Sequence, residues 1–572
     1  MSPKRRASLQ VEAAERLVAL GAGPGVPHGK ADGEHRRRAS VHYEVIDKEA
    51  GEVKPTSSVT PISASWETDA LIRLMIMCGM FTGVLAYIYD WMMDTGLKVV
   101  WEYIPEKITE LVGDDPEGMA LLDKWGFLYI VVVTITLGTC AGLMIKLLGY
   151  PGDLPEIVWC VHNQGWVPMS QTPSMVMCSL FSIVAGGSLG PEAPLVAISA
   201  SCCGWLSYNY FDHDPTMTRK FTLMGMCAGL SAFFGVLLGG ALFALEVCHT
   251  MGLQFFETSV YCVGAGAINL VIFRFLQGQE VGWIWDFPDA PNSTAFEVME
   301  GCLLGVVASA VALLFHKLHK GIGKLEHGYG KFEDSEHPVM LAMMGAICVA
   351  IIGIFLPPTM FWGEFELKSV AVPSKELEHI WPKGGFWGLE PFEWDNGVMC
   401  LVVGLFKLVA ISCTVHGGFR GGFIFPLMFS GSCLGKAIIA IPGMDQYLTP
   451  AVACMCMASA LCTAVTRTPF ACALITVELC GQPAAAGPVT AATMVALFMT
   501  HKYPFIGAQQ DRTDLLWVQD LVDRRTMETP SKDAANDVPV AATVTEGEPL
   551  VGSAASKVNG SYAATDVERV AF

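Results

Sequence analysis

The segment Gly190-Pro191-Glu192-Ala193-Pro194-Leu195 lies within the run AGGSLGPEAPLVAISA (residues 185–200) and places one carboxylate between two prolines. Proline is tolerated in the first turn of a helix, so the pattern predicts a helix N-terminus at this point. Such an end exposes N–H groups and the positive end of the helix dipole, which together bind anions. Because an ionisable side chain in an apolar, membrane-like setting is costly, Glu192 is a candidate functional residue.

The segment has a second copy later in the chain. Gly422-Phe423-Ile424-Phe425-Pro426-Leu427 matches it at an offset of 232 residues. The same offset pairs Ala232 with Ala464, Ala241 with Ala473, Leu242 with Leu474 and Glu246 with Glu478. This shared register indicates an internal duplication in which each half carries an interrupted helix. Interrupted helices at corresponding positions of two halves indicate a transport site between them.

The composition is that of a multi-span membrane protein. Of 572 residues, 52% are hydrophobic and 16% are charged, whereas soluble domains carry about 25% charged residues. Apolar segments recur from residue 68 to residue 503, and several are too short to cross a hydrocarbon core of about 30 Å. Short, glycine-punctuated helices predict broken spans around a polar path. We therefore expect an all-α integral membrane protein in contact with membrane lipid.

Charge and cysteine usage exclude other classes. The net charge of −19 argues against nucleic acid as a partner. The 19 cysteines lie mostly in apolar runs, where they behave as small hydrophobic residues. Because no histidine stands at a ligand spacing from them, we expect no metal and no cofactor.

The chain divides into four predicted parts. They are a polar N-terminal tail (1–65), a first membrane repeat (66–253), a second membrane repeat (254–510) and a disordered C-terminal tail (511–572). Positive charge in the first tail and in the predicted loop 317–331 places both termini and that loop in the cytosol. The acidic segments 102–117 and 280–289, also predicted as loops, would face the opposite side. The pattern does not distinguish the plasma membrane from an organelle.

Three positions carry modification motifs. Ser8 and Ser40 follow arginines, as kinase substrates do, and Asn292 begins an Asn-Ser-Thr glycosylation motif. The alternatives are a basic tail that no kinase modifies and a chance glycosylation motif.

The acids in the two halves have different expected roles. An ionised Glu192 would compete with a permeant anion for its helix end, and a protonated or displaced Glu192 would admit the anion. The alternative is that Glu192 only caps its helix. Glu246 and Glu478 recur in both halves, which predicts a shared structural role, bonding backbone N–H groups at helix breaks.

The motifs Gly190-x-Glu192-x-Pro194 and Gly422-x-Ile424-x-Pro426, with the runs 241–247 and 464–479, resemble the CLC family of chloride channels and proton-coupled chloride transporters. The resemblance covers roughly residues 68–505. It implies a homodimer with an anion path in each subunit, an inverted repeat within each subunit, and Glu192 as the gating residue. The anion-binding residues that it implies are Gly152, Gly190, Pro191, Ala193, Phe423, Ile424, Phe425 and Tyr503.

The sequence departs from the family pattern at three places. Gly152 stands where the family has an anion-coordinating serine, which leaves the preferred anion open. At the position where the family's transporters often carry a glutamate that relays protons, this chain has Val247, as the family's channels do. The central tyrosine is either Tyr503 or, in a stricter alignment, replaced by Ile506.

We therefore expect chloride permeation through a glutamate-gated pore, as in a voltage- or pH-gated chloride channel. The alternatives are a chloride/proton exchanger and a carrier of another monovalent anion such as nitrate. An intramembrane enzyme would need a nucleophile and a base at reacting distance, and neither His162 nor His249 has a suitable spacing. We expect His249 to lie at a helix end facing water.

Overall fold

The computed structural model describes residues 61–113, 115–163, 165–210, 215–249, 258–281, 294–330, 337–371 and 396–509. The predictions for Ser8, Ser40, Asn292, the C-terminal tail and the repeat boundary at 253/254 lie outside these residues, as does the N-terminal tail up to residue 60. The chain forms two units, Met1–Leu74 and Met75–Phe572. The first contributes the start of one helix to the described residues, and the second contains the other elements.

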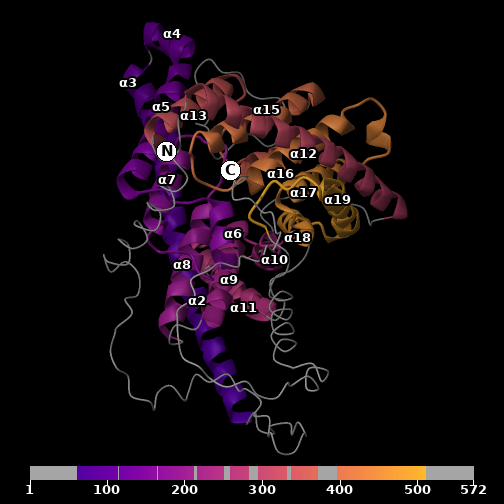
Figure 1. Ribbon diagram of the computed structural model, residues 1–572. Helices are drawn as coiled ribbons and strands as arrows, with labels where there is room; N and C mark the ends of the chain where they lie inside the picture. The colour runs from indigo at the N-terminus through magenta and orange to yellow at the C-terminus, as the bar shows by residue number, and fades with distance from the viewer. Residues whose placement is uncertain are drawn as a thin grey trace, which may run out of the picture. The chain divides into compact units, whose positions relative to one another are not determined.

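The described elements are helices (Figure 1). In chain order they are α2 (Pro61–Lys98), η2 (Val99–Tyr103), α3 (Ile104–Val112), α4 (Pro116–Trp125), α5 (Phe127–Leu148), α6 (Leu154–Asn163), α7 (Thr172–Val184), α8 (Glu192–Tyr210), α9 (Pro215–Phe234), α10 (Leu237–Val247), α11 (Ser259–Gln277), α12 (Ala295–Gly330), α13 (Pro338–Phe355), η4 (Pro357–Thr359), α14 (Glu364–Ala371), α15 (Gly397–His416), α16 (Ile424–Ile439), η5 (Met444–Gln446), α17 (Pro450–Thr466), α18 (Pro469–Cys480), η6 (Pro483–Ala485) and α19 (Ala486–Thr500).

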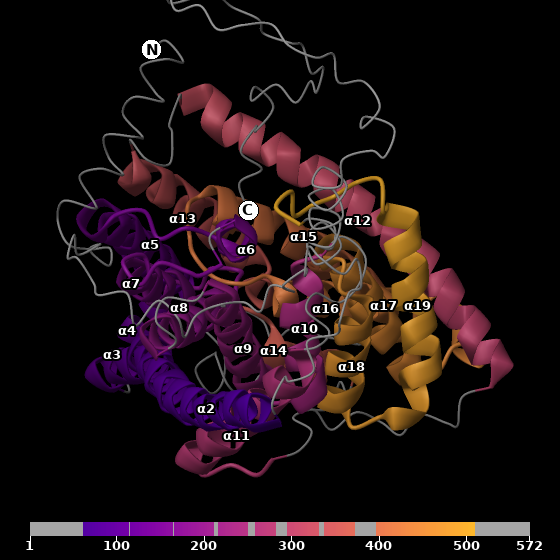
Figure 2. The same cartoon turned by 60° about the horizontal axis from the view of Figure 1, so that its bottom comes forward.

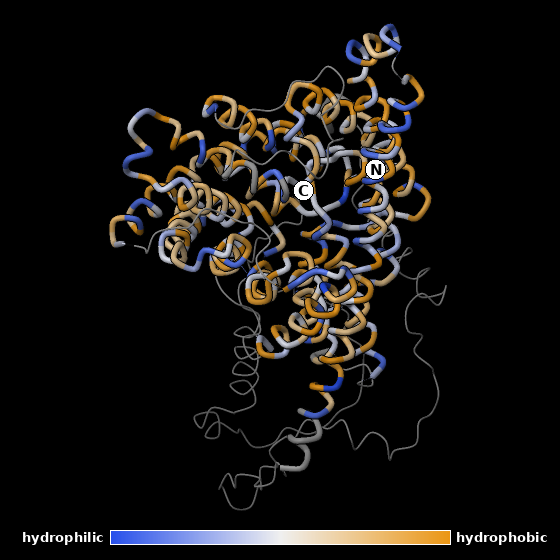
Figure 3. The backbone as a smooth tube through the Cα atoms, turned by 180° about the vertical axis from the view of Figure 1, so that it is seen from behind, coloured by the Kyte–Doolittle hydropathy of each residue, from blue (hydrophilic) through white to orange (hydrophobic). Residues whose placement is uncertain are grey.

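The apolar helices include two length classes. Within the described residues, 7 helical stretches are long and apolar enough to cross a membrane, and α7, α10, α16, α17 and α18 are apolar but shorter, at 10–17 residues. Figure 3 shows hydrophobic residues along most of the helical segments. Short apolar helices leave backbone ends at membrane depth, which is tolerated only where protein surrounds them. The predicted all-α membrane fold with broken helices is confirmed.

Two segments predicted as loops are largely helical. The acidic segment 102–117 continues α2 through η2 and α3 to Val112, where the helix ends at Gly113, and α4 begins at Pro116. The basic segment 317–331 is the end of α12, which runs on to Gly330. The prediction of loops was wrong because lysine and glutamate are strong helix formers, so charge alone does not end a helix.

The centre of the Met75–Phe572 unit is built from two pairs of helices at equivalent positions, α8 with α9 and α16 with α17 (Figure 2). A Cβ on Gly225 of α9 would lie 2.3 Å from the carbonyl oxygen of Ser199 of α8, so the backbones of these two helices are in contact. In the second pair, a Cβ on Gly431 would lie 2.5 Å from the carbonyl oxygen of Met457. The repeat offset matches Ser199 with Gly431 and Gly225 with Met457. The same close approach is thus made in both halves, with the glycine on opposite helices.

Candidate functional site

The two copies of the glycine-proline motif meet in the structure. Gly190 and Gly422 form an antiparallel bridge. Each donates its N–H to the other's carbonyl oxygen at 2.7 Å. Residues that exchange both hydrogen bonds in this way are related by a local two-fold axis. Because the repeat offset makes these two glycines equivalent, the halves are inverted with respect to each other at this point.

The carboxylate of Glu192 lies where two helix N-termini meet. Glu192 begins α8, and α16 begins at Ile424. Phe425 N–H donates to Glu192 Oε1 at 3.4 Å, and the amides of Ile424 and of Glu192 itself also act on the carboxylate. The side chain is 2% exposed, and Oε2 has no hydrogen-bond partner among the described residues. The buried carboxyl group is thus held by backbone dipoles rather than by a cation.

The loop before Glu192 is fixed from three sides. Ser188 N–H donates to Thr414 Oγ1 of α15 at 3.1 Å. Phe361 N–H donates to the carbonyl oxygen of Gly186 at 3.2 Å, and Trp101 Nε1 donates to that of Val184 at 2.8 Å. These contacts come from elements far apart in the chain, and together they set the direction in which α8 begins.

A buried lysine holds the segment that carries Phe361. Lys407 lies within α15 and is 0% exposed. Its Nζ donates to the carbonyl oxygens of Thr359, Met360 and Phe361 at 3.1, 3.0 and 2.8 Å. Buried Glu366 supplies an opposing charge. The sequence analysis missed Lys407, although an ionisable residue in the middle of an apolar helix was a usable signal.

Glu246 and Glu478 bind the opposite half of the molecule. Glu246, in α10, accepts hydrogen bonds from Phe470 N–H (3.3 Å) and Ala471 N–H (2.8 Å) at the start of α18. The backbone amides of Leu238 and Gly239, at the start of α10, donate hydrogen bonds to Glu478 of α18 in the same way. The repeat offset maps each of these contacts onto the other, so each acid caps the helix that carries its counterpart.

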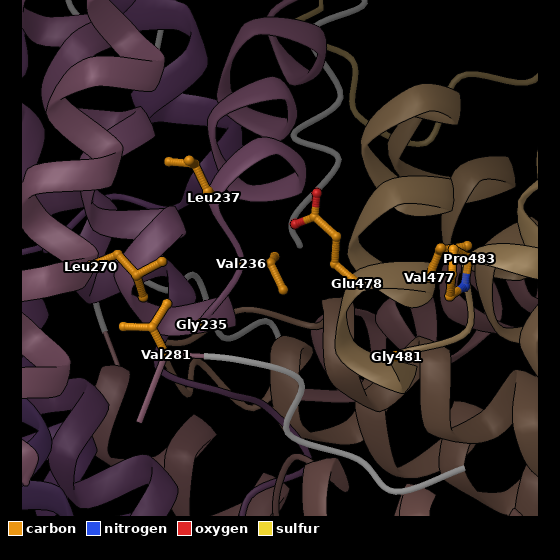
Figure 4. A pocket seen from close by; sticks show the side chains of 9 residues that line it. All are labelled: Gly235, Val236, Leu237, Leu270, Val281, Val477, Glu478, Gly481 and Pro483. Atoms are coloured by element: carbon orange, nitrogen blue, oxygen red, sulfur yellow. The ribbon is translucent and has the colours of Figure 1, made fainter. Parts of the chain in front are cut away.

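A cavity of about 350 Å³ lies beside the second of these caps. Figure 4 shows Glu478 extending from α18 toward Val236 and Leu237. The cavity is otherwise mainly apolar, and its remaining lining residues are Gly235, Leu270, Val281, Val477, Gly481 and Pro483.

Replacing Glu246 with glutamine is expected to destabilise the protein by about 1–3 kcal/mol, because an amide –NH₂ then faces a backbone N–H donor. The thermal unfolding midpoint in detergent measures this, and Glu478→Gln should lower it in the same direction. Glu297→Gln, at an exposed position, is the control and should leave the midpoint nearly unchanged. A midpoint equal to wild type in Glu246→Gln would contradict the capping role.

The predicted anion-site residues around Glu192 lie together. Pro191 provides the carbonyl oxygen for the first helical hydrogen bond of α8, from Leu195 N–H at 3.2 Å, and Ala193 is buried in the first turn. Phe423 is the N-cap residue of α16. The ring of Phe425 makes edge contacts with Phe233 and Phe234, at centroid distances of 5.2 and 5.4 Å.

Gly152 and Tyr503 make their described contacts elsewhere. Gly152 has φ +75°, and a Cβ there would lie 3.1 Å from Glu156 Oε2 and 3.3 Å from Gln171 Oε1. Tyr503 is 52% exposed, whereas the neighbouring Phe505 is buried with its ring centroid 6.3 Å from that of Phe423.

Val247, the last residue of α10, and His249, shortly after it, are both buried. Val247 is buried, and its carbonyl oxygen accepts a hydrogen bond from Gln509 Nε2 at 3.0 Å. His249 is 1% exposed, with its ring centroid 6.4 Å from that of His162. The expectation that His249 faces water was wrong, because the side chain is buried. A second pair of buried histidines, His319 and His416, had no sequence signal, since the two lie on different helices.

Comparison with known proteins places these features in a family. A family model described as voltage gated chloride channel matches residues 137–501. A protein of Pseudomonas syringae pv. tomato named chloride/fluoride channel protein is 22% identical over 430 residues, which cover 73% of this chain and 85% of that protein.

Two solved structures share the fold. One is a CLC-type fluoride/proton antiporter, with a TM-score of 0.59, 18% identity, and coverage of 78% of this chain and 99% of that chain. The other is a slow cyanobacterial Cl⁻/H⁺ antiporter, with a TM-score of 0.60, 16% identity, and coverage of 80% and 98%. At these identities the similarity concerns the arrangement of helices.

Proposed function

This chain belongs to the voltage gated chloride channel (CLC) family of anion-transport proteins, and from that premise we propose that it conducts chloride passively through a path gated by Glu192. The observation that carries the proposal is the position of the Glu192 carboxylate, on the amides that begin α8 and α16. A chloride ion would use the same N–H groups, so the carboxylate and the anion exclude each other.

Val247 supports passive conduction over coupled exchange. An apolar residue at this buried position cannot take up a proton. The second candidate is chloride/proton exchange, which is favoured by the antiporter descriptions of the two structures with the same fold. Fluoride and nitrate are the alternative anions, the first because of the name of the Pseudomonas relative. We further propose a homodimer without enzymatic activity.

Reversal potentials decide between channel and exchanger. The purified protein is placed in a planar bilayer with a fixed chloride gradient, and the pH of one side is stepped. A reversal potential that stays at the chloride equilibrium value supports the channel. A potential that moves with the pH gradient supports coupled exchange, and absence of anion current in wild type and in Glu192→Gln contradicts both.

Gly152→Ser tests whether the loop before α6 lines the anion path. The change places a hydroxyl near Glu156 and Gln171 at φ +75°, a left-handed conformation that costs a non-glycine residue about 1 kcal/mol. We expect the permeability ratios among chloride, nitrate and bromide to change about two- to tenfold, the effect of one net hydrogen bond. Gly152→Ala, with the same strain and no hydroxyl, should keep the wild-type ratios. Equal ratios in both variants would remove Gly152 from the path.

A further inference from the structure

The structure holds a pair of stacked imidazoles beside the start of α16. His319 of α12 and His416 at the end of α15 are 2% and 6% exposed. Their ring centroids are 4.2 Å apart, and the ring planes are inclined by 34°. Two titratable rings in contact within a membrane helix bundle need a physical explanation, because apolar side chains would fill the same volume without the cost of burying polar groups.

The hydrogen bonds assign a tautomer to each ring. Ser412 Oγ donates its single hydrogen to the carbonyl oxygen of Leu408 at 2.9 Å, so it accepts from His319 Nδ1–H at 3.2 Å. His416 Nε2–H donates to the carbonyl oxygen of His319 at 2.9 Å. The neutral pair therefore keeps one basic nitrogen on each ring, Nε2 of His319 and Nδ1 of His416.

An aromatic bridge connects the pair to the anion site. The ring of Phe505 lies 5.0 Å from that of His319, 5.1 Å from that of Phe315 and 6.3 Å from that of Phe423. Phe423 is the N-cap residue of α16, whose first amides hold Glu192. A positive charge on the pair would thus lie two rings away from the helix end where the anion binds, and it could also rest against the face of Phe505.

The first proton on the pair opposes a second. The titratable or charged groups on α12, on α15 and on the elements packed against them include His316, Lys317, Lys320 and Lys324 of α12, Cys413 of α15, Cys348 of α13, Arg420 after α15, Arg467 at the end of α17, and His501 and Lys502 after α19. Most are cationic, and a second proton on rings 4.2 Å apart would meet the charge of the first.

We propose that His319 and His416 form a single proton-binding site that, when occupied, draws the anion to the start of α16 from the side of the membrane that bears the lysines of α12. This rests on the proposed anion transport. Imidazole is the side chain whose ordinary titration falls between about pH 5 and pH 8, so acidification through that range is the trial of this site. Acidification on that side alone raises the anion current.

The test uses the full chain in planar bilayers with Glu192→Gln, so that the pH response of the gate itself is absent. Lowering the pH on the lysine-bearing side from about 7.5 to about 5.5 should raise the chloride current about three- to tenfold, as expected for one charge acting across a partly shielded distance. Adding His319→Asn and His416→Gln should abolish the rise. These amides keep an N–H near Nδ1 and Nε2 respectively, so both hydrogen bonds survive without a titratable ring.

His501→Asn in the same background is the matched control, because His501 also bonds a carbonyl oxygen but is exposed. It should keep the rise. A rise that persists without the pair, that disappears in the control, or that follows acidification of the opposite side would overturn the proposal. An intact chloride current without any pH response overturns it as well and leaves the proposed function standing.

A second measurement follows the protonation of the two histidines directly and does not depend on anion transport. Exchange of the imidazole C2 hydrogens for deuterium, followed by mass spectrometry, reports the protonation of each histidine as the pH changes. We expect His319 and His416 to share one titration and His319 to titrate alone in His416→Gln. If both rates stay flat from about pH 8 to about pH 5, the pair binds no proton and the proposal fails. Loss of all anion current with this titration intact refutes the proposed function only.

Discussion

Glu192→Gln is expected to raise the chloride current at neutral pH about 10- to 100-fold. Hydrogen bonds to a charged group contribute about 1.5–3 kcal/mol, and each 1.4 kcal/mol corresponds to a factor of about ten in occupancy. The neutral amide gives up this advantage at the N-termini of α8 and α16, so the anion competes successfully for Phe425 N–H. Single-channel or liposome flux recordings at matched protein density measure the change.

The control for this variant is Glu478→Gln. It neutralises another carboxylate that backbone amides stabilise at a helix start, but one placed at the α10 break rather than at the meeting of the two motifs. Its current per folded protein should equal that of wild type. If Glu192→Gln also equals wild type, Glu192 caps its helix and does not gate.

Gly190→Ala is expected to open the path as far as Glu192→Gln does, although it leaves the acid in place. The three atoms nearest to a Cβ on Gly190 all belong to the Glu192 carboxyl group: Oε2 at 2.4 Å, Cδ at 3.0 Å and Oε1 at 3.1 Å. A methyl group therefore overlaps Oε2, the carboxyl oxygen that does not take the hydrogen bond from Phe425 N–H. Forcing atoms into a packed site costs about 1–3 kcal/mol, comparable to the hydrogen bond that holds Glu192, so the side chain swings away.

A double-mutant cycle separates this displacement from general damage. In Glu192→Ala, the carboxyl group is already absent, so adding Gly190→Ala should change neither the current nor the unfolding midpoint further. Gly422→Ala is less informative, because its Cβ would also lie 2.7 Å from Glu192 Cβ. Gly321→Ala is the neutral control, since a Cβ there meets nothing within 4 Å. Additive effects of the two changes would contradict the steric account.

The site around Glu192 was predicted from local patterns. Proline and glycine fix where a helix begins whatever surrounds it, so the start of α8 at Glu192 and of α16 at Ile424 could be read from the chain. Tyr503 is exposed in the structure, and no pattern in the short turn after α19 specifies which side chain points inward.

What the sequence alone determined was the duplicated, broken-helix membrane fold and the acid at the start of α8, since both follow from short-range spacing and one repeated register. The tertiary structure alone decided the partners: Gly190 with Gly422, Lys407 with the carbonyl oxygens of the η4 segment, and His319 with His416. These contacts join residues on different helices, whose packing depends on many side chains at once. A buried charge or an imidazole pair is stable only where that packing supplies its dipoles and hydrogen-bond acceptors.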